Sequence, residues 1–190
     1  MNIDKDRIAR AVKEIILAIG EDPEREGMLK TPERVAEMFA EIFAGIGQDI
    51  ETDIAVYTTS NQDEMIVMRD ISFFSMCEHH LLPFFGTVSI AYIPDNNRIT
   101  GFSALARVVD SMAKRPQLQE RMTTEIADAL VKVLKPLGVF VIMRAQHLCV
   151  SMRGVKKAGT WTVTSAMRGI MRKEATRLEA LSLMGERHSS

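Results

Sequence analysis

The stretch GTVSIAYIP, residues 86–94, alternates regularly between two kinds of side chain. Val88, Ile90 and Tyr92 are large and apolar, whereas the positions between them hold smaller or polar residues. Because successive side chains of a strand point to opposite faces, this period of two predicts a β-strand that rests one face on a core.

Three other runs favour strands, and five favour helices. The strand candidates are residues 64–74, 139–143 with a continuation toward Met152, and 160–167. Helical spacing of apolar residues predicts helices over residues 4–19, 31–43, 103–114, about 117–134 and 173–184. Thr31 is expected to cap the second helix, with Pro32 in its first turn. Strand pairs joined by short turns favour antiparallel hairpins, so the predicted class is α+β with an antiparallel sheet.

Length and composition indicate a soluble chain with one main domain. Residues 1–63 are expected to form an N-terminal helical extension, and residues 64–190 the main domain. The chain has 46% hydrophobic and 26% charged residues and a net charge of −1. It shows neither a membrane-spanning run nor a secretory signal, so we expect a cytoplasmic protein without a membrane partner.

The cysteines and histidines are few and lie close together. SMCEHHLLPFFG, residues 75–86, holds Cys77, His79 and His80, and QHLCVSMRG holds His147 and Cys149. If the second stretch is a strand, His147 and Cys149 share a face, and the two motifs can converge. Three such donors around zinc, with water in the fourth position, are typical of a catalytic site. Two alternatives stay open here: buried cysteines that act as small apolar residues, and a disulfide.

Polar residues that suit a phosphorylated ligand lie elsewhere in the chain. Ser103 and Arg107 are four positions apart on one predicted helical face, and Gln119 and Glu120 lie near a helix start. A carboxylate can accept two parallel hydrogen bonds from an amidine edge such as that of guanine, although a helix-dipole partner is the alternative. Residues 144–177 hold eight Lys/Arg and one acidic residue, which favours phosphate binding or a solvated face. Aromatic residues are not interleaved with them, so we expect no nucleic-acid partner.

Four blocks together resemble the GTP cyclohydrolase I family: MCEHHLLPFFG, RPQLQER, HLCVSMRGV and TVTSAMRG. The similarity runs from about residue 7 to residue 183. It implies the tunnelling fold (T-fold), in which residues 64–190 form a catalytic domain with helices on one face of the sheet. Sheets of neighbouring subunits then join into a barrel. The resemblance also implies a homo-oligomer, a decamer, with active sites between subunits.

The resemblance implies a reaction and a set of site residues. The reaction is zinc-dependent hydrolytic opening of the purine imidazole ring of GTP at C8, with formate release and recyclisation to 7,8-dihydroneopterin triphosphate. The implied zinc ligands are Cys77, His80 and Cys149, and the implied catalytic residues are His79 and His147. The implied guanine contacts are Gln119 and Glu120, and the implied triphosphate contacts are Ser103, Arg107, Arg153 and Arg34.

Three positions depart from the family pattern. Ala104 stands where a lysine is usual, Glu37 where many relatives have a basic residue, and Trp161 where a small or basic residue is common. Two alternatives to GTP hydrolysis therefore stay open. One is a paralogue that acts on a less phosphorylated or modified purine nucleotide. The other is a catalytically silent member of the fold that binds a pterin or a nucleotide.

Overall fold

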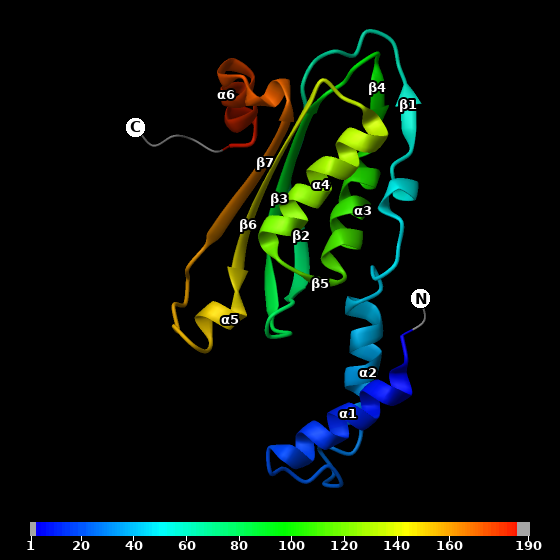
Figure 1. Cartoon of the computed structure of the whole chain (residues 1–190), viewed down its shortest axis with the longest axis vertical. Coiled ribbons are helices and arrows are strands. Elements are labelled where there is room, and N and C mark those ends of the chain that lie inside the picture. The colour runs from blue at the N-terminus through cyan, green and yellow to red at the C-terminus, as the bar shows by residue number, and fades with distance from the viewer. Residues whose placement is uncertain (1–2, 186–190) are drawn as a thin grey trace.

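The alternating stretch lies in the middle strand of a five-stranded sheet (Figure 1). The computed structural model describes residues 3–185. The sheet order is β5 (Pro116–Gln117), β2 (Ile66–Cys77), β3 (Pro83–Ile93), β6 (Gly138–His147) and β7 (Thr162–Gly169). All pairs are antiparallel except the short β2–β5 pair. The predicted α+β class and antiparallel sheet are confirmed.

Five longer helices accompany this sheet, close to the predicted ranges. They are α1 (Lys5–Ala18), α2 (Thr31–Ile42), α3 (Phe102–Ala113), α4 (Gln119–Leu134) and α6 (Glu174–Leu183). The short elements are η1 (Ile50–Asp53), β1 (Val56–Thr58), β4 (Arg98–Thr100), α5 (Leu148–Ser151) and η2 (Ile170–Arg172). Each helix described in residues 3–185 is too short or too polar to cross a lipid bilayer.

The main core lies between the sheet and the pair α3 and α4. Val88, Ile90 and Tyr92 are fully buried there, as their alternation predicted. Helix α6 packs on the opposite face near one end of the sheet, where it helps to bury Ala91 and Ile93. Both faces of β3 are therefore covered at that end, whereas the two long helices α3 and α4 share one face as expected.

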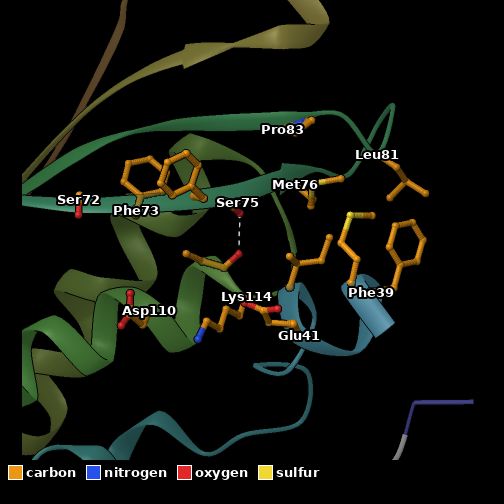
Figure 2. Close-up of a pocket in the computed structure, with 14 residues that line it drawn as sticks. Phe39, Glu41, Ser72, Phe73, Ser75, Met76, Leu81, Pro83, Asp110 and Lys114 are labelled. Carbon is orange, nitrogen blue, oxygen red and sulfur yellow. Dashed lines mark hydrogen bonds between the residues drawn. The ribbon is translucent and has the colours of Figure 1, made fainter. Parts of the chain in front are cut away.

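The N-terminal helices α1 and α2 pack against each other at one end of the molecule (Figure 1). Between α2 and β2 lies an apolar pocket of about 700 Å³, across which Phe39 faces the Met76 and Leu81 end of the strand (Figure 2). Ser75 donates a hydrogen bond of 2.7 Å to the carbonyl of Ala113 beside it. None of the predicted site residues lines this pocket. The predicted domain boundary at residue 63 stays a prediction.

Three local predictions need correction. Thr31 is the first residue of α2 and does not cap it; Lys30 occupies the cap position. Residues 45–63, which carry no clear period and were predicted as a connection without regular structure, contain η1 and β1, because β1 finds a partner in β4 far along the chain. The strand predicted to run on toward Met152 ends at His147 and is followed by the helical turn α5. Hydrogen bonds within that turn, such as Met152 N–H to Leu148 O at 3.0 Å, replace the sheet ladder.

Candidate active site

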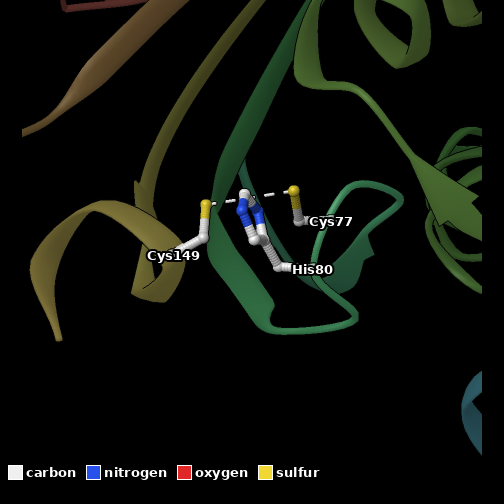
Figure 3. Close-up of side chains that lie close together, drawn as sticks. All are labelled: Cys77, His80 and Cys149. Atoms are coloured by element: carbon white, nitrogen blue, oxygen red, sulfur yellow. Dashed lines mark hydrogen bonds between the residues drawn. The ribbon is translucent and has the colours of Figure 1, made fainter. Parts of the chain in front are cut away.

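Two cysteines and one histidine meet at one end of the sheet, as Figure 3 shows. Cys77 ends β2, His80 lies in the turn that leads to β3, and Cys149 lies in α5. The antiparallel β3–β6 ladder brings these segments together, since its last pair joins Phe84 to His147. The convergence predicted from the two motifs is thus present, although Cys149 reaches it from a helical turn and not from a strand.

The geometry of this group suits a tetrahedral metal ion. One possible ligand atom from each of Cys77, His80 and Cys149 lies within 4.8 Å of the others, and the two sulfur atoms are 3.9 Å apart. Both thiols are free. Zn–S bonds of about 2.3 Å at a tetrahedral angle place two sulfur atoms about 3.8 Å apart. Cys77 is buried and His80 is exposed, so the donors form a group that is open on one side.

His147 lies beside the metal group and is held on two sides. Its ring stacks on Phe84 with the ring centroids 4.7 Å apart and the planes 1° from parallel. Its Nε2 is 2.7 Å from Oε1 of Gln119. Burial lowers the pKa of His147, and the nearby carboxylate of Glu120 opposes that shift. Phe84 was not among the predicted site residues; its only signal in the sequence is its place in the strand that follows the His79–His80 turn.

Gln119 is buried at the start of α4, and its side-chain amide bonds to His147 and to strands β6 and β7. The resemblance implied that this side chain contacts guanine, but its amide is already hydrogen-bonded to these partners. Glu120, the next residue, is exposed, and it is near enough to His147 for its charge to act on the pKa of that ring. Of the two predicted guanine contacts, only Glu120 therefore has an accessible side chain.

Two more predicted residues border the metal group. Nη1 of Arg153 is 2.8 Å from Nε2 of His80. The ring of His79 is exposed and lies 6.2 Å from the ring of His80, nearly perpendicular to it. Burial raises the pKa of the Cys149 thiol, its hydrogen bond and proximity to Cys77 raise it further, and the charge of Arg153 lowers it.

Three other predicted residues are not brought to this group within one chain. Ser103 and Arg107 are exposed on α3, about 15 and 9 Å along the helix axis from its end at Ala113. Only that end of α3 leads into β5, which pairs with the Cys77 end of β2. Arg34 is exposed on α2, in the N-terminal helical pair.

The three departures from the family pattern have local structural settings. Ala104 is 2% exposed, so its methyl group packs inside the chain. Glu37 forms an ion pair of 2.7 Å with Lys5 across α1 and α2. The half-exposed ring of Trp161 lies under the guanidinium of Arg144, 6.0 Å from its carbon. Each residue is thus compatible with its surroundings in this chain.

Comparison with known proteins decides the family. The family model described as GTP cyclohydrolase I matches residues 8–185. The chain belongs to the GTP cyclohydrolase I family. The GTP cyclohydrolase 1 of Thermoanaerobacter pseudethanolicus is 54% identical over 186 residues, which cover 97% of this chain and 99% of that protein. That of Desulforamulus reducens is 55% identical over 95% of this chain and 97% of its own length.

A third relative in the GTP cyclohydrolase I family, from Brevibacillus brevis, is 51% identical over 97% of this chain and 99% of its own. The solved structure of an archaeosine synthase QueF-like protein in the apo form shares 17% identity and a TM-score of 0.41. It covers 58% of this chain and 97% of that chain, and is too distant to inform the site. The segment matched by the family model contains every cysteine and histidine of the candidate site.

Proposed function

We propose that this chain catalyses the hydrolytic opening of the imidazole ring of GTP at C8, with formate release and recyclisation to 7,8-dihydroneopterin triphosphate. The observation that carries the proposal is the convergence of Cys77, His80 and Cys149 in a chain that matches the GTP cyclohydrolase I family over residues 8–185. The three relatives above, at 51–55% identity, carry the name of this enzyme. Hydrolysis of a cyclic amidine is thus the activity that both lines of evidence favour.

The donor set supports zinc as the metal. Two thiolates and one imidazole, 3.9 Å apart at the sulfur atoms, would hold the ion and leave its fourth position open. Zinc in such an open site supplies activated water for hydrolysis near neutral pH. The thiols of Cys77 and Cys149 must lose their protons when the metal binds, so metal affinity is expected to fall in acid.

The surrounding side chains have separate tasks in this proposal. His147 exchanges a proton with the purine ring from a position fixed by its neighbours, and His79 carries protons at the exposed edge of the turn. Glu120 accepts hydrogen bonds from N1–H and the 2-amino group of guanine. Arg153 provides a cation for the triphosphate, because its guanidinium already lies beside His80.

The remaining triphosphate contacts support a homo-oligomer. Ser103, Arg107 and Arg34 lie on α3 and α2, away from the metal group of their own chain. A second subunit that placed these residues beside Arg153 would complete the anion site. We therefore propose an assembly with active sites between subunits, in the decameric form that the resemblance implies. Within residues 3–185, nothing about the helices suggests a membrane-bound form.

The zinc-loaded chain is incubated separately with GTP, GDP, GMP and guanosine. Turnover is measured as formate release and as the absorbance of the dihydropterin product. We expect GTP to be turned over and the others to be slower or inert. C149A should lose both bound metal and activity, whereas V155A, exposed in the following loop, should retain both. A wild-type chain that holds metal but releases no formate from GTP would contradict the proposal. A preference for GMP or guanosine would favour the alternative that Ala104 suggested, a paralogue that acts on a less phosphorylated purine nucleotide.

A further inference from the structure

The orientation of the Gln119 side-chain amide is fixed by two strands. Gln119 is 1% exposed, and its Nε2 lies 3.1 Å from the carbonyl oxygens of both Met143 in β6 and Thr162 in β7. Carbonyl oxygens only accept hydrogen bonds, so the nitrogen of the amide must face them. The alternative orientation would bury two pairs of facing oxygens, which costs free energy for each unpaired group.

A closed ring of hydroxyl hydrogen bonds fixes the same orientation independently. Thr123 Oγ1 donates to the backbone carbonyl of Gln119 at 2.7 Å. The hydroxyl of Thr164 lies 2.7 Å from that of Thr123, so it must be the donor in this pair. Its oxygen then accepts from Nε2 of Gln119 at 3.0 Å, so the two hydrogens of that nitrogen serve three acceptors and one of them is shared. Each hydroxyl proton in the ring therefore has only one possible acceptor. The ring and the two carbonyls thus require the same orientation, with the amide nitrogen of Gln119 toward the strands.

With the nitrogen turned toward the strands, Oε1 of Gln119 faces Nε2 of His147 at 2.7 Å. An amide oxygen can only accept, so Nε2 of His147 must carry the hydrogen. A neutral imidazole has one N–H, which leaves the lone pair on Nδ1. We propose that Gln119 is a positioning residue that holds His147 in the Nε2–H tautomer. The proposal rests on the function proposed above and assigns Nδ1 as the nitrogen that exchanges protons with the substrate.

Phe84 and Gln119 restrict different motions of His147. The stacked ring of Phe84 fixes the plane of the imidazole, and the Gln119 oxygen fixes the direction of its Nε2–H bond. General acid–base catalysis requires the reacting nitrogen to be in place and correctly protonated. This task replaces the side-chain contact between Gln119 and guanine that the sequence analysis expected.

The first test measures the tautomer directly in the wild-type chain. The zinc-loaded protein is labelled with ¹⁵N-histidine, and its ring signals are recorded by magic-angle-spinning NMR. The chain has four histidines, and loss of one set of signals in H147N assigns His147. We expect a protonated Nε2 and an unprotonated Nδ1 in the neutral ring. A neutral ring with its hydrogen on Nδ1 would overturn the proposal, and this result needs no Gln119 variant to fold.

The second test compares Q119M with Q119E, two side chains of similar length. Both lose the N–H bonds to Met143 and Thr162, but only Q119E keeps an acceptor for His147. Because Q119E also turns a carboxyl oxygen toward those two buried carbonyls, it should be the less stable variant, and the kinetics are compared at a temperature where both are folded. We expect kcat to fall about 10²-fold in Q119M while KM for GTP stays within about twofold. Q119E should keep the Nε2–H tautomer and at least about tenfold more of kcat than Q119M.

Two outcomes of the comparison contradict the proposal. Equal loss of kcat in the two variants would show that Gln119 serves only the packing of β6 and β7. A raised KM with an unchanged kcat would instead support a contact between the Gln119 side chain and guanine. The proposed function fails differently, because it requires the wild-type chain to release formate, whereas the tautomer is measured without turnover.

Discussion

Replacing Phe84 by leucine tests whether the stacked ring positions His147. Phe84 is fully buried; it stacks on His147 at 4.7 Å and meets Phe73 edge-on at 5.7 Å. Leucine keeps most of the volume but none of the flat surface. A core swap of this kind costs up to about 1.5 kcal/mol, and each lost aromatic pair about 0.5–1.5 kcal/mol. We therefore expect F84L to lower the free energy of unfolding by about 2–3 kcal/mol.

F73L is the matched control for this substitution. Phe73 is 3% exposed and belongs to the same core, but it contacts Phe84 and not His147. Because F73L loses one aromatic pair, it should cost about 1–2 kcal/mol. Thermal midpoints should fall by about 2–4 °C for each kcal/mol.

Kinetics should separate the two variants. At a temperature where both are folded, kcat for formate release should fall about ten- to hundredfold in F84L, because a small displacement of a catalytic group is costly. F73L should keep the wild-type kcat. Equal losses of kcat in the two variants, or a fully active F84L, would refute the idea that the stack positions His147.

Four further predictions follow from the site and the sheet. E120Q should raise KM for GTP about 10- to 100-fold, because charge-assisted hydrogen bonds contribute about 1.5–3 kcal/mol; an unchanged KM in steady-state assays would place guanine elsewhere. G86A should prevent folding, because its Cβ would lie 1.8 Å from the carbonyl of Arg144; a wild-type circular dichroism melt would contradict the close β3–β6 approach. A104K should lower the thermal midpoint, because inserting a larger side chain at a buried site costs about 1–3 kcal/mol. An unchanged midpoint together with a lower KM for GTP would mean that this position faces phosphate. Zinc at 100 times its dissociation constant should stabilise the wild type by about 2.7 kcal/mol over the chelator-treated form, and C149A should show no such difference.

Periodicity predicted the elements whose large apolar side chains lie mainly on one face. The alternation of Val88, Ile90 and Tyr92 identified β3, and helical spacing located α3 and α4 to within a few residues. Such patterns are visible in the sequence because each element turns its large apolar side chains toward the main core; on the other face of β3, smaller side chains such as Ala91 pack near α6. The same logic failed after His147, where four residues are too few to show a helical period and hydrogen bonds within the turn decide the structure.

The candidate site was predictable where it depended on residue type. Two cysteines, each near a histidine, indicated that the two motifs could converge, and the family resemblance implied Cys77, His80 and Cys149 as the ligands; these three residues do meet. Contacts that depend on the direction of a side chain were not predictable. The sequence cannot tell whether the amide of Gln119 points to a ligand or to β6 and β7, because the strand that supplies Thr162 lies 43 positions away. The stack of Phe84 on His147 likewise depends on the β3–β6 register.

The sulfur atoms of Cys77 and Cys149 come from segments 72 positions apart. At roughly 5–20 residues per second, a ribosome needs about 4–14 s to add the second thiol after the first. A nascent chain during that interval offers only an incomplete and weak set of donors. A metal site that needs both thiols is complete only when β6 has joined the sheet, so an ion bound there would come from the metals that the cell makes available to the newly folded chain. Copper binds such donors more tightly than zinc and would compete for the site at that moment.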